Sequence, residues 1–231
     1  MKKNIVIIGA SSGIGAELTK ILLAQGNHVY SYSRNQPEFT HESLQHQTTD
    51  VTHTDFQLNQ LPDIIDGLVY CPGTINLKPV RRLTTEDIIN DFNINALGAI
   101  KTVQQAYKGL RKSTSASIVL FSSVAVQTGM AFHTSIAAAK GAVEGITRSL
   151  AAELAPTIRV NAIAPSLTDT PLAETFLSTD EKKNQSAQRH PLKRVGSASD
   201  QAEAAAYLLS EKAGWMTGQI LHIDGGMSHI R

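Results

Sequence analysis

The 231-residue chain has a single cysteine, a formal net charge of only +1 and no uninterrupted apolar run of membrane-spanning length. One cysteine cannot form an intramolecular disulfide, so Cys71 is expected to be a free thiol, which fits a reducing cytoplasm. The low net charge gives no reason to expect a nucleic acid or an anionic membrane as the main partner. The apolar run at 5–8 is too short for the core of a signal peptide. These absences favour a cytoplasmic protein, and the residues predict no metal site.

The hydrophobic residues, 42% of the chain, form short apolar runs that alternate with helical patterns. Strands are expected at residues 4–8, 29–33, 45–49, 66–71, 117–121, 158–163 and 219–223. Helices are expected from Ile14 to a stop at Gly26, and at 87–95, 99–110, 134–154 and 200–209. Strands that alternate with helices pair in parallel through right-handed crossovers. The sequence therefore predicts a doubly wound α/β fold of the Rossmann type with about seven strands.

Residues 1–231 are expected to form one domain, because no proline- or glycine-rich linker and no internal repeat divides the chain. Residues 166–197 differ from the rest, being polar, irregular and rich in Lys, Gln and Ser. In a compact domain such a segment is usually a lid or binding loop, so we expect it to contact the substrate. It carries no recognisable motif and does not identify that substrate.

Three glycines, Gly9, Gly13 and Gly15, join the first predicted strand to the first helix. A dinucleotide site needs glycine at such a turn, because the backbone must approach a pyrophosphate closely and the helix N-terminus offers free amides to it. The spacing G-x-x-x-G-x-G differs from the commoner G-x-G-x-x-G pattern. The loop residues expected to bind the cofactor are Gly9, Ser11, Ser12, Gly13, Ile14 and Gly15.

The end of the second predicted strand bears on the choice of cofactor. An acidic residue there would bind the ribose 2′-hydroxyl of NAD, whereas an arginine suits the 2′-phosphate of NADP. The chain has Ser33, Arg34 and Asn35 at this point and no acid. NADP(H) is therefore the preferred cofactor and NAD(H) a possible one, with the alternative that Arg34 is a solvated surface residue.

Several further segments give the chain a resemblance to the short-chain dehydrogenase/reductase family. They follow the glycine loop in the family's order, cover essentially the whole chain, and comprise Asp50-Val51, Asn95, Ser122-Ser123, residues 159–165 and residues 218–226. The resemblance implies a nicotinamide-dependent oxidoreductase that acts on a small carbonyl compound or alcohol. It also implies a homodimer or homotetramer built on the long helices around 99–112 and 134–154.

The resemblance assigns further residues to the cofactor. Besides the loop and Arg34 they are Asp50 and Val51 for the adenine, Pro72 and Gly73 for the adenosine side, Lys140 for the nicotinamide ribose, and Pro165, Thr168 and Thr170 for the nicotinamide. Two segments depart from the family's pattern. Tyr70-Cys71-Pro72-Gly73 replaces Asn-Asn-Ala-Gly, and Pro165-Ser166 replaces Pro-Gly. Cys71 is expected to be a small buried hydrophobe rather than a nucleophile.

The catalytic set that the resemblance implies is incomplete. The family uses a tyrosine four residues before a lysine, so that both lie on one helix face. Lys140 matches the lysine, and Ser123 and Asn95 match the family's serine and asparagine. Ile136 stands where the tyrosine belongs, and no tyrosine lies between Tyr107 and Tyr207. An isoleucine side chain can neither donate nor accept a proton.

A different proton donor is therefore needed, and His133 is the candidate. It could share a helix face with Ile136 and Lys140 if the helix extends that far back, and an imidazole is a suitable general acid near neutral pH. The alternative is that His133 lies in the preceding loop or only packs. Two functions stay open: an NADP(H)-dependent oxidoreductase with His133, Ser123 or water as proton source, and a non-catalytic NADP(H)-binding protein, such as a redox sensor or the silent partner of an active relative.

Overall fold

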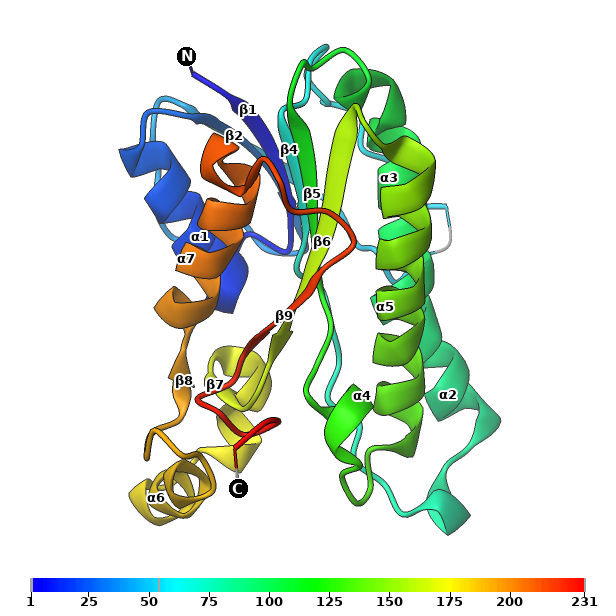
Figure 1. Cartoon of the computed structure of the whole chain (residues 1–231), viewed down its shortest axis with the longest axis vertical. Coiled ribbons are helices and arrows are strands. Elements are labelled where there is room, and N and C mark those ends of the chain that lie inside the picture. The colour runs from blue at the N-terminus through cyan, green and yellow to red at the C-terminus, as the bar shows by residue number, and fades with distance from the viewer. Residues whose placement is uncertain (1, 54, 231) are drawn as a thin grey trace.

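A seven-stranded parallel sheet runs through the middle of the computed structural model, which describes residues 2–53 and 55–230, and helices cover both of its faces (Figure 1). The strand order is β3-β2-β1-β4-β5-β6-β9. The strands are β1 (Asn4–Ile8), β2 (His28–Ser33), β3 (Leu44–Thr48), β4 (Gly67–Tyr70), β5 (Ala116–Phe121), β6 (Ile158–Pro165) and β9 (Ile220–Ile223). The doubly wound α/β fold predicted from the alternating pattern is confirmed.

The helices form a layer on each side of the sheet. One side carries α1 (Gly13–Ala24) and α7 (Ala198–Leu209), and the other carries α2 (Thr85–Phe92), α3 (Gly98–Leu110) and α5 (Thr134–Leu154) (Figure 1). The short α4 (Ala125–Thr128) precedes α5, and α6 (Asp180–Gln188) lies at one end of the molecule. No helix in the described part of the chain is both long and apolar enough to cross a membrane.

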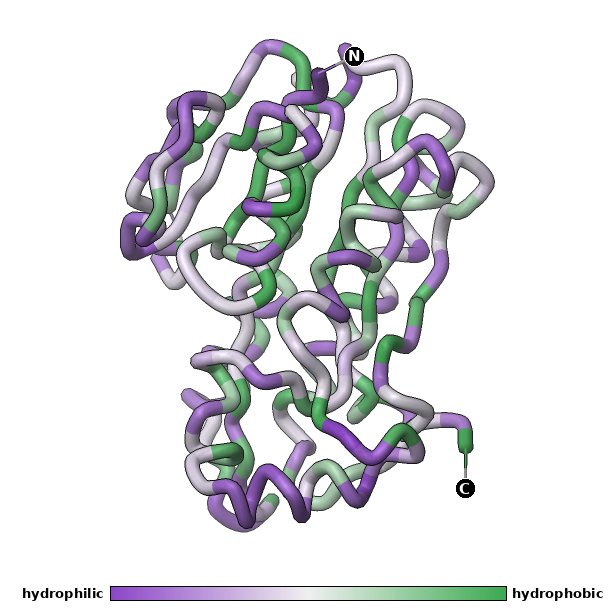
Figure 2. The backbone as a smooth tube through the Cα atoms, turned by 90° about the vertical axis from the view of Figure 1, so that its left-hand side faces the viewer, coloured by the Kyte–Doolittle hydropathy of each residue, from purple (hydrophilic) through white to green (hydrophobic). Residues whose placement is uncertain are grey.

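Alternation along the strands builds a separate apolar core on each face. In β1, Val6 and Ile8 pack into the core under α3 and α5, whereas Ile5 and Ile7 pack into the core under α1 and α7. Successive residues of a strand point to opposite faces, so a strand covered on both sides must be apolar throughout. Figure 2 shows the hydrophobic residues concentrated in the strands and the hydrophilic ones toward the outside.

The strand order reverses between β1 and β4, because the chain first extends the sheet through β2 and β3 and then returns to the other side of β1. In open α/β sheets the crevice at the carboxyl ends of the strands beside such a reversal is the usual ligand site. Gly9 follows β1 there and Cys71 follows β4, with the Cys71 amide bonded to the Ile8 carbonyl at 3.0 Å. The topology therefore brings the two segments to one edge of the sheet.

The expectation that residues 166–197 are irregular is wrong. The segment contains β7 (Thr168–Asp169) paired with β8 (Gly196–Ser197), a 3-10 helix at Pro171–Phe176, and α6. Helix α6 begins with a cap, since the Thr179 hydroxyl accepts a hydrogen bond from the Lys182 amide, and Asp180 and Glu181 occupy its first turn. Carboxylates at that end stabilise a helix through its dipole. The helix was missed because it has no apolar face, and apolar spacing is the signal that reveals a helix in a sequence.

Other boundaries shift for local reasons. Helix α2 begins at Thr85 rather than at residue 87, because Thr84 and Asp87 form a capping box. Helices α2 and α3 are joined by a π-helical segment, Asn93–Leu97, which sequence patterns do not reveal. Strand β6 continues to Pro165, so the strand itself carries the chain to the edge where the site lies.

We predict that Gly15→Ala destabilises the protein by about 1–3 kcal/mol or more, because its Cβ would lie 2.2 Å from the Gly9 carbonyl oxygen. Gly141→Ala is the matched control within α5, where the added methyl would make an ordinary 3.8 Å contact with Val126. The control is expected to keep or raise stability by about 0.5–1 kcal/mol through helix propensity. Urea unfolding measures both, and an equal effect of the two variants would contradict the close approach.

Candidate functional site

Two joined hollows lie at the carboxyl edge of the sheet. The first, called here the glycine-loop cleft, has a volume of about 480 Å³ and lies between the loop after β1, the ends of β2 and β3, and the segment after β4. The second, the inner cavity, has a volume of about 420 Å³ and lies deeper, against α5 and α6. Gly73, Thr74 and Thr170 line both hollows, so the two adjoin.

Most residues expected to bind the cofactor line the glycine-loop cleft. These are Gly9, Ser11, Ser12, Gly13, Ile14, Gly15, Arg34, Asp50, Val51, Pro72, Gly73 and Thr170. The others, Lys140, Pro165 and Thr168, line the inner cavity. The structure thus brings the predicted cofactor residues together around two adjoining hollows.

The glycine loop has the backbone geometry that its sequence suggests. Gly9 and Gly13 have positive φ angles of 83° and 54°, which L side chains rarely adopt. The N-cap of α1, Ser12, makes no side-chain cap hydrogen bond, and the first turn carries no acidic residue. The first amides of α1 therefore face the cleft without a side-chain acceptor, and an anion such as a phosphate would satisfy them.

Arg34 lies exposed at the rim of the glycine-loop cleft, close enough to Asp50 for their charges to interact. Burial by itself would raise the pKa of Asp50, but hydrogen bonds from Thr52 and the positive charge of Arg34 lower this pKa overall. The Thr52 amide donates to the carboxylate at 2.9 Å. Asp50, which follows β3, thus lies within electrostatic range of the exposed Arg34, which follows β2.

Lys140 is buried where the two hollows meet. Its Nζ donates a hydrogen bond to the Phe121 carbonyl at 2.8 Å, and burial lowers its pKa to about 8. A Cβ built on Gly73 would lie 3.3 Å from this Nζ and 3.2 Å from Asn95 Oδ1. The missing side chain of Gly73 therefore leaves space beside both the ammonium and the amide oxygen, although Asn95 itself is not among the residues that line either hollow.

Asn95 carries a buried acceptor without a partner. Its Nδ2 donates to the Thr74 hydroxyl at 2.9 Å and to the Asp91 carbonyl at 2.8 Å, whereas Oδ1 accepts no hydrogen bond from the described residues. Buried polar atoms are nearly always satisfied, so a water or a ligand group is expected to donate to this oxygen. The observation fits a site that a polar ligand completes.

Sequence reasoning missed a buried carboxylate behind this junction. Asp91 is fully buried and accepts hydrogen bonds from Thr74 at 2.7 Å and from Ser135 at 2.5 Å. Its charge favours the protonated form of Lys140, in opposition to burial. No spacing links residues 74, 91 and 135, so only the folded chain reveals the cluster. Cys71 lies close to Lys140, and burial raises the pKa of its thiol to about 12, so it stays neutral.

The two serines after β5 differ in their partners. Ser122 is buried and donates to Glu144 at 3.0 Å, whereas Ser123 is half-buried and accepts a hydrogen bond from the Ala125 amide at 3.2 Å. The hydroxyl proton of Ser123 is therefore uncommitted among the described residues. Both serines line the inner cavity, but only Ser123 can donate to a ligand there.

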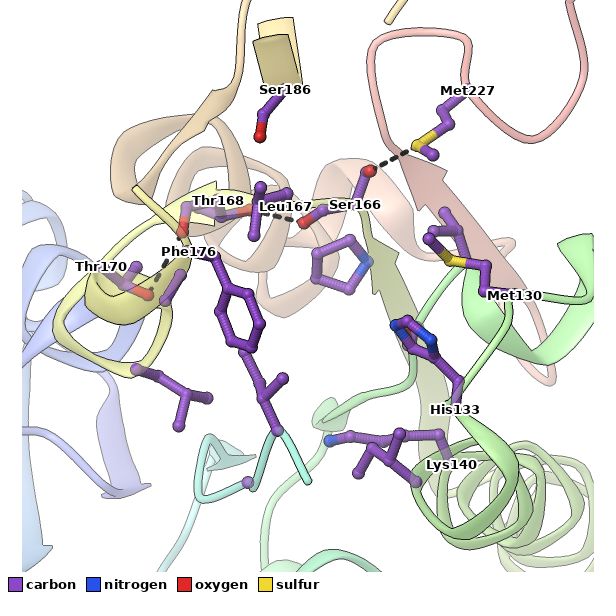
Figure 3. A pocket seen from close by; sticks show the side chains of 18 of the residues that line it. Met130, His133, Lys140, Ser166, Leu167, Thr168, Thr170, Phe176, Ser186 and Met227 are labelled. Atoms are coloured by element: carbon purple, nitrogen blue, oxygen red, sulfur yellow. Dashed lines mark hydrogen bonds between the residues drawn. The ribbon is translucent and has the colours of Figure 1, made fainter. Parts of the chain in front are cut away.

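His133 reaches the inner cavity by a different route from the one expected. Helix α5 begins at Thr134, so His133 precedes the helix and does not share its face with Ile136 and Lys140. Its ring nevertheless points into the cavity above Lys140, near Met130 (Figure 3). Nδ1 lies 2.7 Å from the Ala131 carbonyl oxygen, which can only accept, so Nδ1 carries a proton and Nε2 is left to exchange one. Ile136 is buried in the same wall.

Sequence reasoning also missed a serine–histidine pair, Ser166 and His190, on the opposite wall of the inner cavity. Ser166 Oγ lies 2.8 Å from His190 Nε2 and 2.9 Å from Met227 Sδ, and Figure 3 shows Ser166 directed toward Met227 and away from Lys140. His190 is buried, with Nδ1 2.9 Å from the Ser186 carbonyl oxygen. The replacement of the expected glycine by Ser166 was the available signal, but its partner lies 24 residues away, after α6.

Comparison with known proteins gives this arrangement a family. The family described as Enoyl-(Acyl carrier protein) reductase matches residues 9–228. A tropinone reductase homolog from Arabidopsis thaliana is 31% identical over 242 residues, covering 97% of this chain and 92% of the plant protein. A short-chain dehydrogenase family structure from Francisella tularensis superimposes with a TM-score of 0.91 at 27% identity, covering 99% of each chain. The chain belongs to the short-chain dehydrogenase/reductase family.

The short-chain dehydrogenase/reductase assignment is that of an oxidoreductase family whose members bind NAD(P)(H). An L-xylulose reductase from Caenorhabditis elegans is 31% identical over 243 residues, covering 98% of this chain and 96% of that enzyme. The structure of ElxO with NADP bound superimposes with a TM-score of 0.87 at 26% identity, covering 98% of this chain and 99% of that one. The glycine loop, Gly73 and the unpartnered Asn95 oxygen fit such a ligand, because they offer free amides, space and an acceptor where the two hollows meet.

Lys140 makes the stability of the protein depend on pH. Its pKa falls from 10.5 to about 8 on folding, so below pH 8 the folded state carries a buried cation that costs about 3 kcal/mol. As pH rises from about 8 to 10.5 the folded state loses the proton before the unfolded state does, and this cost disappears. Lys140→Met lacks this dependence.

We therefore predict that the free energy of unfolding of the wild type, relative to Lys140→Met, rises by about 2–3 kcal/mol between pH 7 and pH 10. Urea unfolding at several pH values measures this difference, and groups common to both proteins cancel in it. A difference that stays constant across this range would show that Lys140 titrates normally.

Proposed function

We propose that the protein is an NADP(H)-dependent oxidoreductase that interconverts a small carbonyl compound and its alcohol, with a proton donor other than the family's tyrosine. The observation that carries the proposal is the junction of the two hollows, where Lys140, Asn95 and Gly73 meet. The glycine-loop cleft would hold the dinucleotide and the inner cavity the substrate. Reduced nicotinamide supplies the hydride in such a reaction.

The cofactor assignments follow the two hollows. The amides of the glycine loop would bind the pyrophosphate, Asp50 and Val51 the adenine, and Lys140 a hydroxyl of the nicotinamide ribose. Pro165, Thr168 and Thr170 would contact the nicotinamide. NADP(H) is preferred because Arg34 with Ser33 and Asn35 can bind a 2′-phosphate, while Asp50 nearby leaves NAD(H) possible.

Substrate chemistry requires a donor near the reacting oxygen. Ser123 would donate a hydrogen bond to the substrate oxygen, and His133 would give the proton that the alkoxide needs after hydride reaches the carbonyl carbon. Both line the inner cavity, and the Nε2 of His133 is the ring nitrogen free to transfer a proton. Ile136 would occupy the place of the family's tyrosine and offer the substrate only an apolar contact.

A second candidate function is a non-catalytic NADP(H)-binding protein, either a redox sensor or the silent partner of an active relative. The buried side chain of Ile136 on the cavity wall favours it, since the cavity then lacks the usual acid–base group of the family. A sensor would need different affinities for NADP+ and NADPH.

We also propose an oligomeric state, a cellular location and a role for residues 166–197. A homodimer or homotetramer is supported by the exposed Ile88, Ile89 and Phe92 on α2 and by the outward-facing Ala138 on α5. The lone thiol of Cys71 supports a reducing cytoplasm as the location. Residues 166–197, which contribute α6 to the inner cavity, would act as the substrate lid.

The preference for NADP(H) is tested by measuring cofactor binding. In a fluorescence titration the protein is expected to bind NADPH more tightly than NADH, and Arg34→Gln is expected to weaken NADPH binding about tenfold with little effect on NADH. Arg111→Gln, which removes an exposed arginine outside both hollows, is the control. Equal dissociation constants for NADPH and NADH in the wild type would contradict the NADP(H) preference.

The role of His133 as proton donor is tested by measuring turnover. With an aldehyde, ketone or quinone substrate, His133→Ala is expected to lower kcat by about 10²–10⁴-fold while NADPH affinity stays the same. His41→Ala, which removes a histidine outside both hollows, is the control. A loss in His190→Gln but not in His133→Ala would move the role to the Ser166–His190 pair.

The same assay distinguishes the two functions. If a broad carbonyl panel gives no NADPH oxidation with the wild type, while Ile136→Tyr gains it, the non-catalytic function replaces the oxidoreductase.

A further inference from the structure

The inner cavity has a one-sided distribution of charge. Among the described residues that line it, none is an aspartate or a glutamate. The ionisable side chains on its wall are instead bases, apart from the neutral thiol of Cys71: Lys140, Lys182, Arg189, His133 and His190. A hollow lined by cations in a poorly polar wall concentrates a positive potential. Such a cavity favours a ligand with negative charge.

Two of these cations have no counter-ion among the described residues: Lys182, in the first turn of α6, and Arg189, directly after its last residue. The Arg189 guanidinium is exposed and has no hydrogen bond or ion pair to any described residue. Within the described part of the chain, the Lys182 ammonium donates to two neutral groups and no acid, the Ser178 hydroxyl at 3.0 Å and the Thr175 carbonyl at 3.4 Å. Neither positive charge is therefore offset by an acidic partner among the described residues.

Two other cations of the same segment provide the contrast. Lys183, the neighbour of Lys182, pairs with Asp169, and Arg194 makes a two-pronged ion pair with Asp200 at 2.6 and 2.7 Å. Neither Lys183 nor Arg194 lines the inner cavity. Lys183 and Arg194 are therefore paired with acids, whereas Lys193, which also does not line the cavity, donates to the Gln188 carbonyl at 3.1 Å. Among the described residues, Lys182 and Arg189 make no ion pair.

Apolar side chains make up much of the rest of the cavity wall. They include Ile75, Leu77, Ile136, Leu167, Leu172 and Phe176. An aliphatic or aromatic body would be buried against them at roughly 25 cal/mol per Å² of apolar surface removed from water. The cavity wall thus combines Lys140 and Ser123, a set of apolar side chains, and two cations without an acidic partner among the described residues.

We propose that Arg189 and Lys182 bind an anionic group of the substrate, a carboxylate or a phosphate, whose apolar body places its carbonyl at Lys140 and Ser123. The planar guanidinium suits either anion, because two parallel N–H donors match two oxygens. The substrate class is therefore an apolar carbonyl compound with an anionic group remote from the reacting carbon. This inference rests on the proposed function for the reacting end, but the anion site stands on its own contacts.

The test measures binding without turnover. Calorimetric titration of the protein, with and without NADP+, uses octanoate, octyl phosphate and the neutral isostere octanamide. We expect at least one anion to bind about tenfold or more tightly than octanamide, and the tighter of the two anions identifies the source. Equal affinities of all three ligands, or no binding up to about 10 mM, would overturn the proposal.

Variants locate the effect. Arg189→Gln and Lys182→Gln are each expected to reduce the anion preference about three- to tenfold and to leave octanamide binding unchanged. Lys183→Gln is the matched control, since it removes the same charge from the next residue, which faces away from the cavity. An equal loss in Lys183→Gln would show general surface attraction and would refute the site.

The two proposals fail separately. If carbonyl turnover is absent but the anion preference and its dependence on Arg189 persist, the oxidoreductase function is wrong and the anion site remains. If turnover is present and the methyl esters of oxo-acids have the same kcat/KM as the free acids, the proposed anion site is wrong. The oxidoreductase function then remains.

Discussion

The burial of the Lys140 ammonium between the two hollows is the constraint around which the site is arranged. A buried cation is costly unless it is hydrogen-bonded and electrostatically compensated. Here the Phe121 carbonyl accepts its hydrogen bond, and the buried Asp91 lowers the cost from behind through its charge. Because Gly73 has no side chain, the space beside the ammonium stays open; a Cβ there would lie 3.3 Å from Nζ. The position of α5 against β5 and the segment after β4 are thus tied to one charged group.

The side chains on the wall of the inner cavity determine which groups can transfer a proton there. Ile136 lies on the wall formed by α5 and cannot carry a proton, whereas two imidazoles line the cavity, His133 on one wall and His190 on the other. In each, a carbonyl oxygen fixes the proton on Nδ1 and leaves Nε2 for exchange. His133 presents this nitrogen directly, whereas His190 presents it through Ser166. If His190 is protonated, its Nε2 donates to the Ser166 hydroxyl, and that hydroxyl in turn donates to the Met227 sulfur.

The sheet and the glycine loop could be predicted from the sequence because their signals are local. Buried strands need uninterrupted apolar residues, and a loop that approaches a phosphate needs glycine at fixed places. Helix α6 could not be found, because a helix that is polar all round has no period to detect. The Asp91 cluster and the Ser166–His190 pair could not be found either, since each depends on side chains that only the tertiary fold brings together. His133 was identified for a helical spacing that the structure lacks, although the loop still directs its ring into the cavity.

The most direct test of this account is a crystal structure of the protein with NADP+, because the central claim is that one dinucleotide spans the glycine-loop cleft and ends at Lys140. The account predicts the pyrophosphate at the first amides of α1, a nicotinamide ribose hydroxyl within hydrogen-bonding distance of Lys140 Nζ, and the nicotinamide at the entrance of the inner cavity. A cofactor bound elsewhere, or one whose nicotinamide half lies outside the hollow while Lys140 keeps only the Phe121 carbonyl, would contradict it.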